Sequence, residues 1–141
     1  MVQKLKNILV PVDGSQNALR GVDKAISLAA GGNATITALY VFHLPWKAGI
    51  KFTKSMEGKA QAHATRAIAV AKRKIESAGI PFKWKTSGGK PGDAIINVAK
   101  GENADIIVIG ARGLGSGKEL LLGSVSSYVI HKSKVPVLLV R

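Results

Sequence analysis

The chain has 141 residues, 46% of them hydrophobic and 21% charged, and its formal net charge at pH 7 is +13. This length suits one domain over residues 1–141, and no apolar run approaches the ~18 residues that cross a bilayer, which argues against a membrane protein. The sequence has no cysteine, which excludes disulfides, thiol catalysis and thiolate-bound metals, and no signal-peptide pattern, so we expect a soluble, cytoplasmic protein.

Predicted strands and helices alternate along the whole chain, and no low-complexity linker interrupts them. In chain order we expect a strand at 6–12, a helix at 17–30, a strand at 34–42, a helix at 55–78, a strand at 82–86, a helix at 94–100, a strand at 105–109, a helix at 124–132 and a strand at 135–140. Apolar residues at helical spacing indicate the helices, and runs of β-branched and aromatic residues indicate the strands.

Turn and cap residues mark several boundaries of these elements. The turn Asp13-Gly14-Ser15 follows the first strand and offers Ser15 as the N-cap of the first helix. Gly31 ends that helix by supplying a left-handed conformation. The segment 88–93 is expected to be a turn. In the strand at 82–86 apolar and basic residues alternate, which predicts an edge strand with one solvent-exposed face.

The strict alternation of strands and helices predicts the fold class. Right-handed crossovers place helices on both faces of a parallel sheet, so we expect an α/β fold, a doubly wound, Rossmann-like sheet of five strands in the order 3-2-1-4-5. Ligands bind such sheets at the carboxyl ends of the strands where the strand order reverses, here between the first and fourth strands. The loops that begin at Asp13 and at Gly110 should therefore border one crevice.

Glycines follow the fourth strand, in the segment from Gly110 to Gly117. They let the backbone approach a ligand closely, and the start of the next helix favours an anion such as phosphate. The segment is neither a Walker A motif, because Arg112 replaces its first glycine, nor a dinucleotide fingerprint, which should follow the first strand. A phosphate cradle is favoured over the alternative, a flexible loop with a tight contact between helix and sheet.

Other polar and aromatic residues leave alternatives open. Asp13 either binds adenine or ribose or caps the following helix, and the serines at the start of the last predicted helix either cap that helix or bind phosphate, capping being the simpler interpretation. These serines are Ser124, Ser126 and Ser127. The three histidines, at positions 43, 63 and 131, lack the spacing of a metal site or a catalytic triad. Trp46 and Trp84 either stack on nucleic-acid bases or pack within the protein, and without an RNA-binding motif they are interpreted as packing residues.

Three segments together resemble the universal stress protein family, specifically its ATP-binding branch, over nearly the whole chain. They are 8–15 (ILVPVDGS), 104–113 (ADIIVIGARG), and 121–129 (LLGSVSSYV) with 135–140 (VPVLLV). The nucleotide signature of that family is Gly, two residues, Gly, nine residues, Gly and then Ser or Thr. In this sequence it is complete as Gly110, Gly113, Gly123 and Ser124.

The resemblance implies a binding site and a partner. Adenine and ribose would contact Pro11, Val12, Asp13 and Val41, and ribose and phosphates would contact Gly110, Arg112, Gly113, Gly123, Ser124, Val125 and Ser126. The implied ligand is ATP, or else AMP or ADP, with Mg²⁺ on the phosphates where it is present. The resemblance also implies a homodimer through the final strand, whose exposed apolar edge would otherwise invite aggregation.

Three functions remain open from the sequence. The favoured one is an ATP-binding stress-response protein whose bound nucleotide regulates its conformation or its assembly. A slow Mg²⁺-dependent ATPase is the second, although no catalytic base is evident. The third is nucleic-acid binding driven by the net charge of +13, to which a basic loop at 44–54 contributes. A lysine-rich surface that only aids solubility would account for the charge equally well.

Overall fold

The computed structural model describes residues 4–42, 54–111 and 123–141, in which strands and helices alternate as predicted. The elements are β1 (Asn7–Pro11), α1 (Gln16–Ala29), β2 (Thr35–Phe42), α2 (Lys54–Ser77), β3 (Phe82–Gly88), α3 (Pro91–Gly101), β4 (Ile106–Gly110), α4 (Ser124–Lys132) and β5 (Val137–Val140). Most of the basic loop predicted at 44–54, together with His43 and Trp46, lies outside the described residues.

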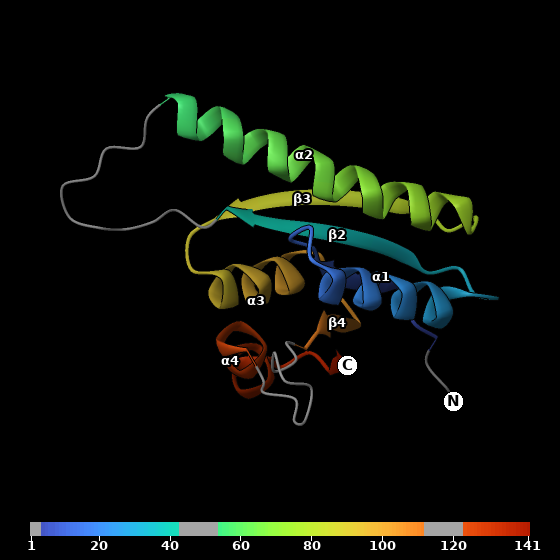
Figure 1. Cartoon of the computed structure of the whole chain (residues 1–141). Helices are drawn as coiled ribbons and strands as arrows, with labels where there is room; N and C mark the ends of the chain where they lie inside the picture. Colours follow the sequence, from blue (N-terminus) through green and yellow to red (C-terminus); the bar gives the residue numbers. More distant parts are fainter. Residues whose placement is uncertain (1–3, 43–53, 112–122) are drawn as a thin grey trace.

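The strands form one parallel sheet in the predicted order, β3-β2-β1-β4-β5. Figure 1 labels β3, β2 and β4 of this sheet. The register pairs Leu9 of β1 with Thr37 of β2 on one side and with Ile107 of β4 on the other. After β1 the chain adds β2 and β3 on one side of β1, and it then crosses back to add β4 and β5 on the other side. The strand order therefore reverses between β1 and β4, and the predicted doubly wound α/β fold is confirmed.

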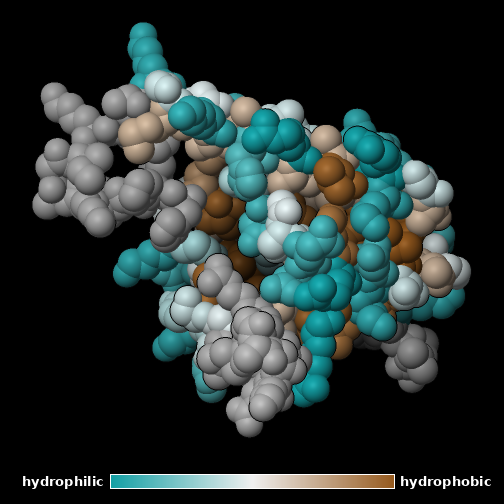
Figure 2. Space-filling model, in the orientation of Figure 1, coloured by the Kyte–Doolittle hydropathy of each residue, from teal (hydrophilic) through white to brown (hydrophobic). Residues whose placement is uncertain are grey.

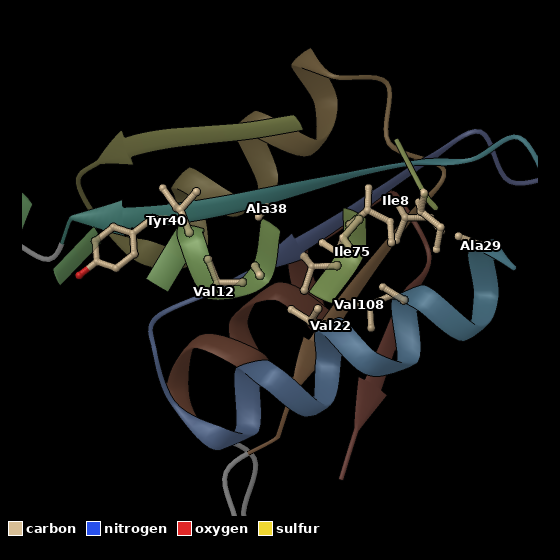
Figure 3. Packing of buried hydrophobic residues seen from close by; sticks show 14 of the residues in the cluster. Ile8, Val12, Val22, Ala29, Ala38, Tyr40, Ile75 and Val108 are labelled. Carbon is tan, nitrogen blue, oxygen red and sulfur yellow. The ribbon is translucent and has the colours of Figure 1, made fainter. Parts of the chain in front are cut away.

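Alternate residues of each strand point to opposite faces of the sheet, and each face has its own core. On the face covered by α1 and α2, buried residues such as Ile8, Val22 and Ile75 pack together (Figure 3). On the other face, under α3 and α4, Leu9, Ile95 and Val129 form the second core. Both faces are apolar because helices cover both of them, as in other parallel sheets.

Alanines of α2 face the first of these cores. Ala64, Ala67 and Ala71 are all buried, and the small side chains let the helix lie close to β2 and β3. The predicted edge strand, β3, is confirmed at the end of the sheet. Trp84 on this strand is 57% exposed, so its interpretation as a packing residue was wrong. A side chain at the outer edge of a sheet lacks a neighbouring strand to cover it.

The helix starts confirm one prediction and correct two. Ser15 is the N-cap of α1, and its side chain accepts a hydrogen bond from the Ala18 amide at 3.2 Å. The helix predicted at 94–100 begins at Pro91, because proline has no N–H to lose and its fixed φ suits a first helical position. The N-cap of α4 is Gly123, with no side-chain cap bond, so the capping interpretation of the serines was wrong.

Across the described ranges, no helix is both long and apolar enough to cross a membrane.

Candidate functional site

A cavity of ≈ 530 Å³ opens at the carboxyl ends of β1, β2 and β4. Its volume lies in the range typical of small-molecule sites. In Figure 2 hydrophobic surface shows in a hollow between hydrophilic side chains, at the side of the molecule where β2 and β3 end. The residues that line the cavity are Pro11, Val12, Asp13, Ser15, Asn17, Ala18, Leu39, Val41, Pro91, Ile95, Ile109, Gly110, Gly123, Ser124, Val125 and Ser126.

Every predicted site residue that the structure describes lines this cavity. The set comprises Pro11, Val12, Asp13, Val41, Gly110, Gly123, Ser124, Val125 and Ser126. Arg112 and Gly113 lie outside the described residues. The loops that follow β1 and β4, identified separately in the sequence, thus meet at one cavity. That these residues contact a nucleotide stays a prediction.

The cavity combines an apolar part with a polar part. Side chains from the sheet and from the start of α3 give it apolar walls, among them Leu39, Val41 and Ile95. Asp13 and the first residues of α4 are polar groups on the same lining. Such a combination suits a ligand with a flat apolar body and a charged or polar tail, since apolar walls desolvate the body and a few polar groups orient it.

Asp13 is fixed by the turn that it begins. Its Oδ1 accepts a hydrogen bond from the Ser15 amide at 2.8 Å, and its side chain is exposed at the cavity. Among the described residues nothing donates a hydrogen bond to Oδ2. The carboxylate therefore supports the turn before α1 and keeps an oxygen available to a ligand hydroxyl or amino group. The N-cap of α1 is Ser15, so the alternative that Asp13 caps this helix was wrong, and binding of adenine or ribose by Asp13 stays a prediction.

The start of α4 is suited to an anion. Gly123 supplies no side-chain cap, and within the described part of the chain the amides of Ser124, Val125 and Ser126 donate to no acceptor. These amides and the helix dipole together favour negative charge at a helix N-terminus. Ser126 is buried, and its Oγ donates to the Gly110 carbonyl at 3.4 Å, which ties α4 to the end of β4.

Gly110 has a packing role that can be read directly from the structure. A Cβ at this position would lie 2.2 Å from the Asn17 carbonyl oxygen and 2.6 Å from the carbonyl carbon. Real Cβ atoms essentially never come so close to backbone atoms. The end of β4 therefore contacts the first turn of α1 in a way that only glycine permits. For Gly110 this is the tight contact between helix and sheet that the sequence left as the alternative, and the other glycines of that segment, up to Gly117, lie outside the described residues.

The sequence analysis missed several residues of the lining. They are Ser15, Asn17 and Ala18 of the first turn of α1 and its cap, Pro91 and Ile95 of α3, and Leu39 and Ile109 of the strands. A general rule would have found the helix residues. In a parallel α/β sheet the helix that follows each strand begins at the carboxyl edge, so the first turns of α1, α3 and α4 all reach the same crevice.

Comparison with known proteins identifies the family. Residues 4–141 match the universal stress protein family. A universal stress protein of Thermus aquaticus is 35% identical over 138 residues, which cover 96% of this chain and 98% of that protein. Among solved structures, protein MJ0577 of Methanocaldococcus jannaschii is 30% identical, with a TM-score of 0.84 over 98% of this chain and 96% of that one. A universal stress protein solved in complex with cAMP is 27% identical, with a TM-score of 0.77 over 99% of each chain. This chain belongs to the universal stress protein family.

Proposed function

We propose that this chain is an ATP-binding member of the family and that the bound nucleotide regulates its conformation or its assembly. One observation carries the proposal: the cavity at the reversal of strand order joins apolar walls to a helix start whose amides have no acceptor among the described residues. The solved relative in complex with cAMP, 27% identical to this chain, supports an adenine nucleotide as the ligand class.

The lining suggests how the nucleotide would lie. Adenine fits between the apolar side chains near Val41 and Ile95, where burial favours a flat aromatic ring. The ribose hydroxyls would donate to the free oxygen of Asp13. The phosphates would then reach the amides of Ser124 and Ser126 at the start of α4. Arg112 and Gly113, outside the described residues, remain predicted contacts of ribose and phosphates.

The net charge favours a longer phosphate chain. A charge of +13 attracts anions over a distance, so ATP gains more from it than AMP does. Within the described part of the chain no group of three or more histidine or acidic residues could hold a metal ion. Any Mg²⁺ would therefore be held mainly by the phosphates themselves, a common mode of Mg²⁺ binding.

Two measurements test the proposal. Mass spectrometry of the small molecules released from denatured, purified protein shows which nucleotide co-purifies. Titration calorimetry with ATP, ADP, AMP and cAMP then compares the wild type with Val41→Trp, which fills the cavity, and Leu28→Trp, which places the same new side chain at an exposed site on α1. We expect Val41→Trp to weaken ATP binding at least tenfold and Leu28→Trp to leave it unchanged. No binding heat from any adenine nucleotide would refute the proposal.

The net charge also favours another of the candidate functions, binding of nucleic acid. Such binding would weaken steeply as salt is added, show little sequence preference and survive Val41→Trp, because it does not use the cavity.

Slow hydrolysis of ATP is separated from simple ATP binding by a measurement of phosphate release, which a regulatory nucleotide site does not require. Binding without release supports the favoured function.

We further propose the homodimer through the final strand. β5 lies at the end of the sheet, and its four residues, Val137–Val140, are all partly exposed and apolar. An unpaired apolar edge of this kind pairs readily with another strand. Light scattering after size exclusion should give twice the mass of the chain. A single-chain mass at all accessible concentrations would overturn this proposal.

A further inference from the structure

His63, on α2, makes contacts that the candidate site does not explain. Its Nε2 lies 2.9 Å from the carbonyl oxygen of Asp13, although the two residues are 50 positions apart in the sequence. The imidazole ring of His63 also packs against the ring of Tyr40, with 5.7 Å between the two ring centroids in an edge-to-face arrangement. The sequence analysis found no metal or catalytic role for this histidine. Its position suggests a different one.

The contact to Asp13 is a hydrogen bond with one possible direction. A carbonyl oxygen only accepts, so Nε2 must carry the proton. The neutral ring is then the Nε2–H tautomer, and the protonated ring also donates from Nε2. The bond therefore exists in both protonation states of His63. Tyr40 shares this region: burial, and secondarily the charge of Asp13, raises the pKa of its hydroxyl above 10.0.

The turn that His63 contacts lines two cavities. One is the main cavity, and a second cavity of ≈ 180 Å³ lies on the α2 side. Val12 and Ala18 line both of them, and His63 lines only the smaller one. A turn with empty space behind it can shift away from a ligand. The imidazole stands on that side and holds the carbonyl of Asp13.

Gly14 shows how closely the ring and the turn fit. Its φ is +85°, a conformation that favours glycine. A Cβ at this position would lie 3.2 Å from Cε1 and 3.3 Å from Nε2 of His63. Before the turn, the Val12 amide donates to the Leu39 carbonyl. At the end of the turn Ser15 caps α1, and the Ser15 amide donates to Oδ1 of Asp13. The bond from His63 restrains its middle.

We propose that His63 is a positioning residue that holds the Asp13–Gly14 turn in the shape that receives the nucleotide. The inference rests on the proposed function, because it assigns the turn to the wall of a nucleotide site. The hydrogen bond from His63 to the Asp13 carbonyl then couples the position of α2 to the shape of the cavity. His63 does not touch the nucleotide and takes no part in any reaction of it.

The test compares variants that keep or remove the donor. His63→Phe keeps a ring of similar size and loses Nε2–H, whereas His63→Gln keeps an N–H donor at nearly the same reach. His131→Phe is the matched control, because His131 lies exposed in the last turn of α4. Two quantities are measured: the ATP affinity by calorimetry, and the hydrogen-exchange rate of the Ser15 amide without nucleotide. ¹⁵N NMR of the ring also identifies the Nε2–H tautomer.

Loss of one hydrogen bond predicts about fivefold weaker ATP binding and about fivefold faster exchange of the Ser15 amide in His63→Phe. His63→Gln and His131→Phe should stay within about twofold of the wild type in both measurements. Unchanged exchange in His63→Phe would overturn the inference whether or not ATP binds. Faster exchange with unchanged ATP affinity would overturn it too. Failure of the wild type to bind any adenine nucleotide would instead refute the proposed function, and the exchange rate would still decide whether His63 holds the turn.

Discussion

Gly110→Ala tests the contact on which the shape of the cavity depends. The added Cβ would lie 2.2 Å from the Asn17 carbonyl oxygen, whereas atoms pack best at about 3.5 Å or more. The end of β4 and the first turn of α1 must therefore separate by about 1 Å. Overpacking costs about 1–3 kcal/mol, and because both partners are backbone, which cannot rotate away, we expect a loss near the upper value. The melting temperature should fall by about 9 °C.

Differential scanning calorimetry measures this loss, with Gly58→Ala as the matched control. Gly58 lies in α2, and a Cβ there meets nothing within 4 Å. Alanine suits a helix better than glycine, so Gly58→Ala should stabilise the protein by about 0.5–1 kcal/mol. The same substitution is thus expected to act in opposite directions at the two sites. A melting temperature of Gly110→Ala within about 2 °C of the wild type would refute the packing argument.

Two further substitutions test the packing between elements. Ile75→Ala removes a fully buried side chain of α2 and should lower the free energy of unfolding in urea by about 2–4 kcal/mol. Val70→Ala, at a position 38% exposed, should lower it by less than about 1 kcal/mol. Equal losses of stability in the two variants would contradict the assigned core. Tyr128 on α4 donates to Asp93 on α3, a bond that raises the pKa of the Tyr128 hydroxyl above 10.0. The protonated hydroxyl is favoured in the folded state, so its contribution to stability is complete below about pH 10 and is lost as the pH rises through the higher folded pKa. The stability of Tyr128→Phe should therefore be lower than that of the wild type at pH 8 and fall less between pH 10 and 11; parallel curves of melting temperature against pH would refute this role.

The sheet could be predicted from the sequence because its evidence is local. Apolar runs mark the buried strands, helices separate them, and the right-handed crossover rule leaves few possible orders. The same rule brought Asp13 and Gly110 to one edge, and the structure places both on the lining of one cavity. The sequence predicted the ends of the helices and strands less accurately than their order. The start of α3 at Pro91 was missed because its first residues, Pro and Gly, are also typical of turns.

Contacts between distant segments could not be predicted in this way. The clash that requires glycine at position 110 depends on the path of α1 beside β4, and the bond from His63 to Asp13 depends on how α2 lies over the sheet. Neither leaves a pattern in the neighbouring residues. The serines at the start of α4 show a related limit, because good capping residues do not cap when glycine takes the N-cap position.

NMR mapping of ATP binding tests most directly that the cavity holds the nucleotide. In ¹H–¹⁵N spectra recorded during a titration, we expect the largest shifts at the amides of Val12 to Ser15 and of Ser124 to Ser126. The amides of β3, at the far edge of the sheet, should shift little. Shifts spread over basic surface positions such as Lys83 and Lys100, with none at the start of α4, would contradict the account.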